Sequence, residues 1–296
     1  MPRDLNPKMR RRLQIVSALL LAGILYAELA FDAEHAPVIN KGLPFVLADD
    51  KIVQTPFEQL VRMDPLQALI VAREGLVRDS RDYTCTFVKQ ERIGAAMSAE
   101  QEIEVKFRPE PYSVVMHWLR NEGMAKRVIY VQGKWRDETE PDPELREHAV
   151  CMPGKGLNLL IKSIKQPING TIAKRSSRRA IDEFGFVRAL DLLIKYCEIA
   201  KDRNELALEF RGESHFDGRP VWLIRRSLPY TGEEGRYPDQ VAEIYIDQEL
   251  HIPVAVYCYS DSDAKPESLL GKYEYRGVRF NTGLTETDFE PATYGM

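Results

Sequence analysis

Residues 83–107 read YTCTFVKQERIGAAMSAEQEIEVKF, and this stretch decides the fold class. Large apolar side chains occupy every second position in its first and last parts: Tyr83, Cys85 and Phe87, then Ile103, Val105 and Phe107. That alternation is typical of two β-strands that each bury one face. The small residues of the Gly94–Ala99 segment predict a turn between them. We therefore expect an antiparallel pair at the start of the domain.

The same kind of pattern continues along most of the chain. Apolar or alternating runs predict further strands at 112–119, 127–132, 206–212, 221–228, 241–247, 254–260 and 271–280. Turn residues such as Asp217-Gly218 separate them. Since the connections are short, the sequence predicts an antiparallel meander of about nine to eleven strands.

Two segments have helical rather than strand periodicity. Asp64 followed by Pro65 is a favourable helix start, and apolar residues then recur at helical spacing over 65–79. A longer helix is predicted over 180–201 for the same reason. Because the residues before it are polar or rich in turn formers, we expect a helical insert at about 141–201 that interrupts the sheet.

The N-terminus has the layout of an export signal. Arginines and a lysine precede an uncharged apolar run at Leu13–Ala27. The run is shorter than the ~20 residues that a spanning helix needs, and its cleavage site is poor. A cleaved signal peptide and a retained signal-anchor over 1–31 therefore both stay open. A tether at 32–56 and a single domain at 57–296 are expected to follow, in the periplasm and either released or anchored to the inner membrane.

Composition excludes several classes of function. Hydrophobic residues make up 44% and charged residues 29% of the chain, as in globular proteins. The net charge is −4, and lysine and arginine are dispersed, so no nucleic-acid footprint is visible. The four cysteines allow three disulfide pairings, and four buried free thiols fit equally well. The basic run Lys174–Arg179 is interpreted as a solvated loop, or as a contact for anionic lipid headgroups or an acidic partner.

Signals of catalysis are weak. The chain contains no nucleophile elbow, zinc-protease motif or phosphate-binding loop, and its five histidines have no metal-ligand spacing. Ser214 and His215 are adjacent in a predicted strand and would point to opposite faces. We therefore predict a protein that is not an enzyme and that uses no metal or other cofactor.

Two parts of the chain resemble known proteins. YTCTFVKQE at 83–91, with EIEVKFRPEPYSVVMHWL at 102–119, resembles the uncharacterised DUF1571 family, which is typical of planctomycetes. EIYIDQELHIPVAVYCYS at 243–260 and the Asn-x-Gly-Leu turn at 281–284 resemble the closing hairpins of the LolA/RseB-like periplasmic superfamily. The resemblance implies an α+β fold in which a strongly curved antiparallel sheet, an unclosed barrel, carries helices on its concave face. In the better-known relatives this cavity holds lipid acyl chains.

A curved sheet with loosely packed helices would leave a mostly apolar pocket. Six side chains on predicted strands are candidates for its lining: Phe87, Val105, Phe107, Trp118, Phe210 and Trp222. For each of them taken singly, ordinary core is the simpler explanation, since apolar strand residues usually belong to the core. The predicted function is non-catalytic binding of a lipid or a lipidated protein in the envelope, for carriage or sensing. The alternative is an envelope scaffold or protein-interaction domain with a filled core and no ligand.

Overall fold

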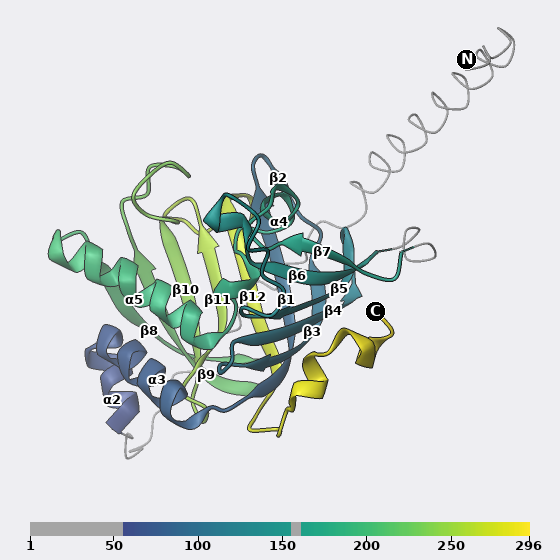
Figure 1. The fold of residues 1–296 in the computed structure, drawn as a ribbon. Helices are drawn as coiled ribbons and strands as arrows, with labels where there is room; N and C mark the ends of the chain where they lie inside the picture. Colours follow the sequence, from purple (N-terminus) through teal and green to yellow (C-terminus); the bar gives the residue numbers. More distant parts are fainter. Residues whose placement is uncertain (1–55, 155–160) are drawn as a thin grey trace, which may run out of the picture. The chain divides into compact units, whose positions relative to one another are not determined.

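The computed structural model describes residues 56–154 and 161–296 (Figure 1). The predicted signal segment and all but the last residue of the predicted tether lie outside the described residues. Within these ranges, no helix combines the length and the apolar character that spanning a membrane requires. The residues of the main hydrophobic core lie between Phe57 and Phe280, so a fragment that starts at residue 51 carries that core in full.

Most of the described chain is one antiparallel sheet in the order β7-β6-β5-β4-β3-β1-β12-β11-β10-β9-β8, with short β2 paired to β1 (Figure 1). One meander runs from β1 to β7 and a second from β8 to β12, and the pairing of β1 with β12 joins them. The strands are β1 (Tyr83–Ile93), β2 (Ala96–Met97), β3 (Gln101–Arg108), β4 (Ser113–Arg120), β5 (Ala125–Val131), β6 (His148–Pro153), β7 (Ile164–Pro167), β8 (Ala207–Phe216), β9 (Arg219–Ser227), β10 (Val241–Asp247), β11 (Pro253–Tyr259) and β12 (Leu269–Phe280).

The sheet curves strongly and does not close. Its two edges are β7 and β8, which pair with one neighbour each and not with one another. Irregular steps in the strand register interrupt six of the pairings, and such bulges bend a strand and increase its twist. They lie at Thr84/Thr86, Glu102/Ile103, Ala125/Arg127, Phe210/Gly212, Tyr245/Ile246 and Cys258/Tyr259.

Helices cover the concave face. They are α2 (Pro56–Met63), α3 (Pro65–Asp79), α4 (Thr171–Ser176) and α5 (Phe186–Asp202), with a short 3-10 turn, η2, at Ile181–Glu183. Helices α2 and α3 contact β8, and α3 also packs against α5, over the β8 half of the sheet (Figure 1). Leu69 of α3 and Leu190 of α5 are fully buried in one core with Ile224 of β9.

The C-terminal segment covers part of the opposite face. Two 3-10 turns, η4 (Glu286–Phe289) and η5 (Pro291–Tyr294), follow β12 and lie against β4 and β5 (Figure 1). Phe289 is only 1% exposed and packs on Val115, Ile129 and Val131. Ahead of them, the Asp82 carboxylate accepts hydrogen bonds from the backbone N–H groups of Thr282, Gly283 and Leu284. The hydrogen bonds to Asp82 account for the Asn-x-Gly-Leu turn at 281–284.

The predicted α+β fold with an unclosed, curved antiparallel sheet is confirmed. The helix at 65–79 has the predicted bounds, and the Asp64 side chain caps it by accepting from the Gln67 N–H. Helix α2 was not predicted. Its residues Phe57, Leu60 and Val61 have helical spacing, but the helix is only eight residues long, which is shorter than the window over which such a period is recognised. All four cysteines are free thiols, which agrees with one of the two alternatives.

The middle of the chain differs from the prediction. The expected insert at 141–201 contains β6 and β7, which extend the sheet. The expected helix at 180–201 begins only at Phe186, because Gly185 is the N-cap residue of α5 and its φ of +108° is not helical. A Cβ at position 185 would also stand 3.0 Å from the Tyr83 hydroxyl and 3.2 Å from the Phe107 ring, so these side chains would have to shift slightly to admit it. Strand β7 is only four residues long, too short for a readable alternation.

Candidate functional site

A cavity of about 740 Å³ lies between the concave face of the sheet and the segment 161–196. Its volume is within the range of small-molecule sites. Strands β1, β4, β5 and β6 form one side of its floor, and β11 and β12 form the other. Strand β7, helix α4 and helix α5 stand around it (Figure 1).

The walls are mostly apolar. Most of the lining surface belongs to aliphatic and aromatic side chains, among them Phe87, Met116, Trp118, Val128, Ile168, Phe184, Leu193, Val256 and Tyr275. Three of the aromatic residues pack together, since the Phe184 ring meets Phe87 edge-on at 5.1 Å and lies 5.9 Å from Tyr275. Such a lining favours a hydrocarbon ligand over a polar one.

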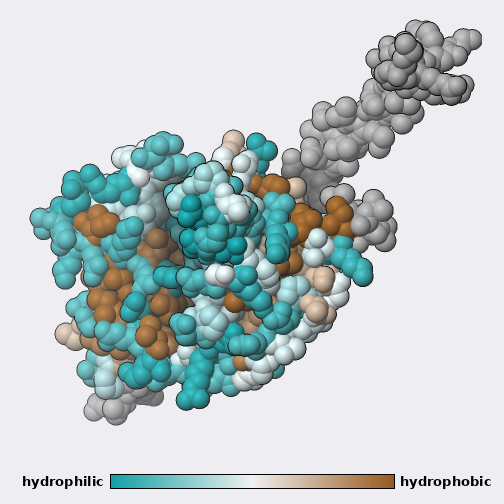
Figure 2. Space-filling model, viewed as in Figure 1, coloured by the Kyte–Doolittle hydropathy of each residue, from teal (hydrophilic) through white to brown (hydrophobic). Residues whose placement is uncertain are grey.

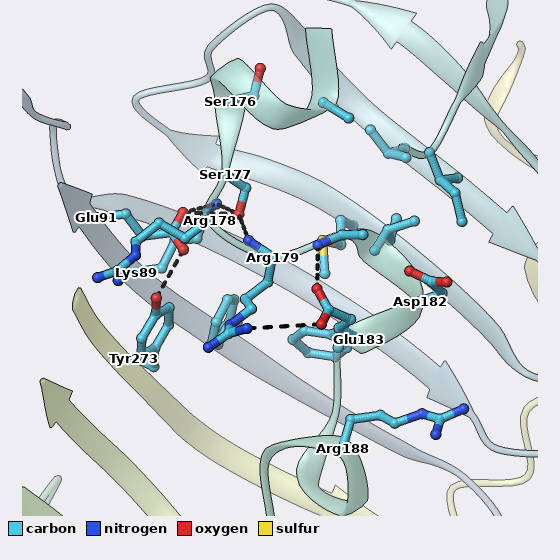
Figure 3. Close-up of a pocket in the computed structure, with 18 of the residues that line it drawn as sticks. Lys89, Glu91, Ser176, Ser177, Arg178, Arg179, Asp182, Glu183, Arg188 and Tyr273 are labelled. Carbon is cyan, nitrogen blue, oxygen red and sulfur yellow. Dashed lines mark hydrogen bonds and ion pairs between the residues drawn. The ribbon is translucent and has the colours of Figure 1, made fainter. Parts of the chain in front are cut away.

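Residues Ser177–Gly185 connect α4 to α5 and pass over the cavity, and we call them the strap (Figure 3). At its far end, the Tyr112 hydroxyl donates to the backbone carbonyls of Ile181 and Phe184, both at 2.8 Å. Tyr112 is itself buried against Phe107. The strap is therefore hydrogen-bonded to the β3–β4 turn at the end that leads into α5.

The near end of the strap is fastened by charged groups on β1 (Figure 3). The buried Lys89 ammonium lies 2.8 Å from Glu91 Oε2 and 2.9 Å from Ser177 Oγ. Ser177 donates to the same Glu91 oxygen, and the Tyr273 hydroxyl donates to the other at 3.0 Å. Arg178 adds a hydrogen bond to the backbone carbonyl of Leu270. The carboxylate is thus hydrogen-bonded at both oxygens.

This cluster contains a serine and a lysine, as serine–lysine catalytic pairs do, but both side chains are bound to Glu91. Lys89 Nζ lies 2.8 Å from Glu91 Oε2 in an ion pair. Burial alone would raise the pKa of Glu91, but Lys89, Ser177 and Tyr273 outweigh burial and hold that pKa below its ordinary value. The hydrogen bonds among Lys89, Glu91 and Ser177 hold the strap against β1, and they do not present Ser177 as a nucleophile.

The lowered pKa of Glu91 gives this fastening a pH dependence. A group whose pKa is lower in the folded protein stabilises it above the ordinary glutamate value of about 4.3, and the contribution is lost as the pH falls through the folded value. Glu91→Gln should lower the free energy of unfolding by about 2 kcal/mol at neutral pH, since Lys89 loses its charged acceptor. Urea denaturation of both proteins across the pH range measures this difference.

The difference between wild type and Glu91→Gln should shrink towards zero in acid, because the protonated carboxyl then resembles the amide. Other carboxylates also titrate, so only the difference between the two proteins is informative. Glu233→Gln is a matched control, because Glu233 is exposed and lies outside the cavity lining. A difference that stays constant down to about pH 3 would contradict the role of Glu91.

Further polar groups line the cavity away from the strap's near end. Arg226 and Asp239 are 1% and 2% exposed and form an ion pair, in which Nη2 donates to both carboxylate oxygens at 2.8 Å. Burial raises the pKa of Asp182 and raises that of Cys258 to about 12. Thiols with a raised pKa are poor nucleophiles.

Metal ligands are not gathered in the described part of the chain, where no group of three or more histidine, cysteine, aspartate or glutamate residues could hold an ion. Among the polar groups at the cavity, Lys89 pairs with Glu91 and Arg226 pairs with Asp239. Trp118 Nε1 and Asp182 Oδ1 are instead buried without a hydrogen-bond partner among the described residues.

Two of the six residues predicted for the lining are at the cavity. Phe87 and Trp118 both contribute to its wall, from β1 and β4. Val105 and Phe107 face the same side of the sheet but are buried in the core, and the Phe107 ring lies under Tyr112 and Phe184. Ligand contact by any of them remains a prediction.

The other two predicted residues lie at the β8 half of the sheet, outside the cavity lining. Trp222 is buried 5.8 Å from the Phe57 ring of α2. Phe210 is partly exposed, and the Arg62 guanidinium lies 4.6 Å above its ring. Helix α2 therefore covers both positions.

Sequence reasoning missed Lys89 and Glu91. A signal for them exists, because the inward positions Cys85 and Phe87 continue by steps of two to 89 and 91. Charged residues on the buried register of a strand indicate a special environment.

The sequence profile of the family described as "Protein of unknown function (DUF1571)" matches residues 80–294. No curated protein matches the chain. Among solved structures, MucB is 15% identical, with a TM-score of 0.42 and coverage of 76% of this chain and 62% of MucB.

Two further structures are similar to a lesser degree. The lipoprotein LppX of Mycobacterium tuberculosis is 13% identical, with a TM-score of 0.38 and coverage of 75% of this chain and 98% of LppX. A LolA superfamily protein of Nitrosomonas europaea is 11% identical, with a TM-score of 0.24 and coverage of 76% and 97%. At these values the likeness carries no information on what this chain binds. The family profile, in contrast, covers most of the chain, and the protein belongs to the DUF1571 family.

Proposed function

We propose that this protein binds a lipid, or the acyl chain of a lipidated protein, in the cavity under the strap, for carriage or sensing in the cell envelope. The observation that carries the proposal is the cavity of about 740 Å³ with apolar walls. Protein interiors are normally packed as densely as organic crystals, and voids larger than a water molecule are few. A large apolar space within an otherwise dense core is therefore best explained by an apolar ligand.

The affinity of such a site comes from hydrocarbon burial. Each methylene group that leaves water contributes about 0.8 kcal/mol. An acyl probe shortened by two methylenes should accordingly bind about tenfold more weakly. The alternative, a scaffold with a filled core, predicts no such dependence on chain length. Binding without catalysis fits the fastened Glu91 and Lys89, whose hydrogen bonds are made within the protein.

The test is native mass spectrometry of residues 51–296, exported to an oxidising periplasm and purified without detergent, followed by titration with fluorescent fatty acids of several chain lengths. We expect a co-purifying acyl species that organic extraction removes, and saturable uptake of the probes that strengthens with length. A bare polypeptide mass together with no probe uptake would contradict the proposal. Uptake that is independent of chain length would point to surface adsorption and count against the cavity.

A further inference from the structure

Exposed apolar side chains surround the opening of the cavity. Met124, Ile161, Ile164 and Ile172 all line it and are nevertheless 63%, 40%, 37% and 43% exposed. They come from the β4–β5 turn, the residues before β7, β7 itself and α4. Large exposed hydrophobic residues are few in the described ranges, and more than half of them lie here. Figure 2 shows apolar side chains gathered near this end of the sheet.

The segment that carries most of this rim is uniformly basic. From position 148 to position 181 the sequence contains lysine and arginine but no aspartate or glutamate. Four of these cations are exposed and form no ion pair with any described residue: Lys162, Lys165, Lys174 and Arg175. Arg179, in contrast, pairs with Glu183. The four exposed cations are therefore the ones available for an external anion.

We propose that this rim docks on an anionic membrane surface, with the apolar tips entering the headgroup–acyl boundary and the four cations facing lipid phosphates. A cluster of apolar residues next to free cations is the pattern of interfacial membrane binding. The inference rests on the proposed function, because docking at the opening lets an acyl chain pass between bilayer and cavity without crossing water.

A bilayer fits these residues better than an acidic protein does. The four apolar residues come from separate elements and form a rim around an opening rather than a continuous flat patch. A protein partner would need shape complementarity over about 800 Å² on each side. A lipid surface needs only apolar tips and positive charge, and it adapts to an irregular rim.

The test is flotation of residues 51–296 with vesicles of phosphatidylcholine alone and of an equal mixture with phosphatidylglycerol. Two variants probe the rim: Ile161→Ser/Ile164→Ser/Ile172→Ser, and Lys162→Gln/Lys165→Gln/Lys174→Gln/Arg175→Gln. All these positions are exposed, so the fold should survive. Met63→Ser/Val77→Ser is the matched control, because both residues are exposed apolar positions outside the cavity lining.

Wild type and the control should bind the mixed vesicles, and binding should weaken in high salt. Each cation removed should weaken binding by about fivefold, and the serine variant should bind at least about tenfold more weakly. Wild type that fails to bind mixed vesicles, or that binds both vesicle types equally, would overturn the docking. So would a control that loses as much binding as the rim variants.

Probe uptake in the absence of vesicles separates this inference from the proposed function. A protein that takes up fatty acid in solution but does not float overturns the docking and leaves the binding function standing. A protein that floats but takes up no probe supports the docking and counts against the cavity as a lipid site. The glutamine variant should take up the probe in solution as wild type does, because none of its four positions lines the cavity.

Discussion

Ala189→Trp is expected to weaken binding of a fatty acid probe by about a hundredfold, because the indole occupies space that about four methylene groups of the ligand would fill. Ala189 lies in the first turn of α5, lines the cavity and is partly exposed. A larger side chain there extends into empty space instead of displacing core atoms. The free energy of unfolding should therefore change by less than about 1 kcal/mol.

Glu198→Trp is the matched control for this substitution. It introduces the same residue on the same helix at an exposed position that does not line the cavity. Probe titration of both variants, with thermal denaturation to verify folding, decides between the cavity and adsorption elsewhere. If Ala189→Trp folds and binds the probe as tightly as wild type, the ligand site lies outside this cavity.

Phe289→Ala should lower the free energy of unfolding by about 4 kcal/mol, the range for an aromatic side chain removed from a packed site. Phe289 is 1% exposed and is the central residue of the cluster that holds the C-terminal segment against β4 and β5. The Arg108 guanidinium lies 5.0 Å from its ring and would lose that contact as well. Urea denaturation monitored by circular dichroism measures the loss.

Thr287→Ala serves as the control in the same turn. Thr287 is exposed, and the bond it makes to Thr293 uses its backbone carbonyl, while its side chain has no hydrogen bond to a described residue. Its effect should be within about 0.5 kcal/mol. Probe affinity should be unchanged in Phe289→Ala under conditions where the protein stays folded, because Phe289 is not part of the cavity lining. A loss of stability below about 1 kcal/mol would mean that the C-terminal segment contributes little to the fold.

Much of the sheet could be predicted from the sequence because its strands are buried on one face. Strand β3 is the clearest case, with Ile103, Val105 and Phe107 inward and charged residues between them. Strand β10 has the predicted bounds. Strand β6 escaped prediction because its HAVCMP sequence has no alternation, and a continuous apolar run of that length does not distinguish strand from helix.

The sequence predicts that an apolar cavity lies on one face of the sheet, but it does not predict which inward-facing side chains line that cavity. Phe87 and Phe107 have the same pattern in the sequence and face the same side of the sheet, yet only Phe87 lines the cavity. The difference arises from the strap, whose Phe184 ring and Gly185 backbone cover Phe107. The path of a connecting segment over a sheet depends on tertiary contacts, such as those of Tyr112 with the strap, and no local periodicity encodes it.

The pairing of β1 with β12 has a consequence for how the chain reaches this structure. Both meanders consist of neighbours in sequence and can form early, whereas the strand pair at the middle of the sheet joins residues near the two ends of the domain. Such distant pairings are slow, because a long loop must close first. A nascent chain that lacks β12 exposes the edges of β1 and β11, which are open to pairing with other chains. Assembly of the domain is thus expected to finish only with its last strand, so truncations before Leu269 should aggregate rather than fold.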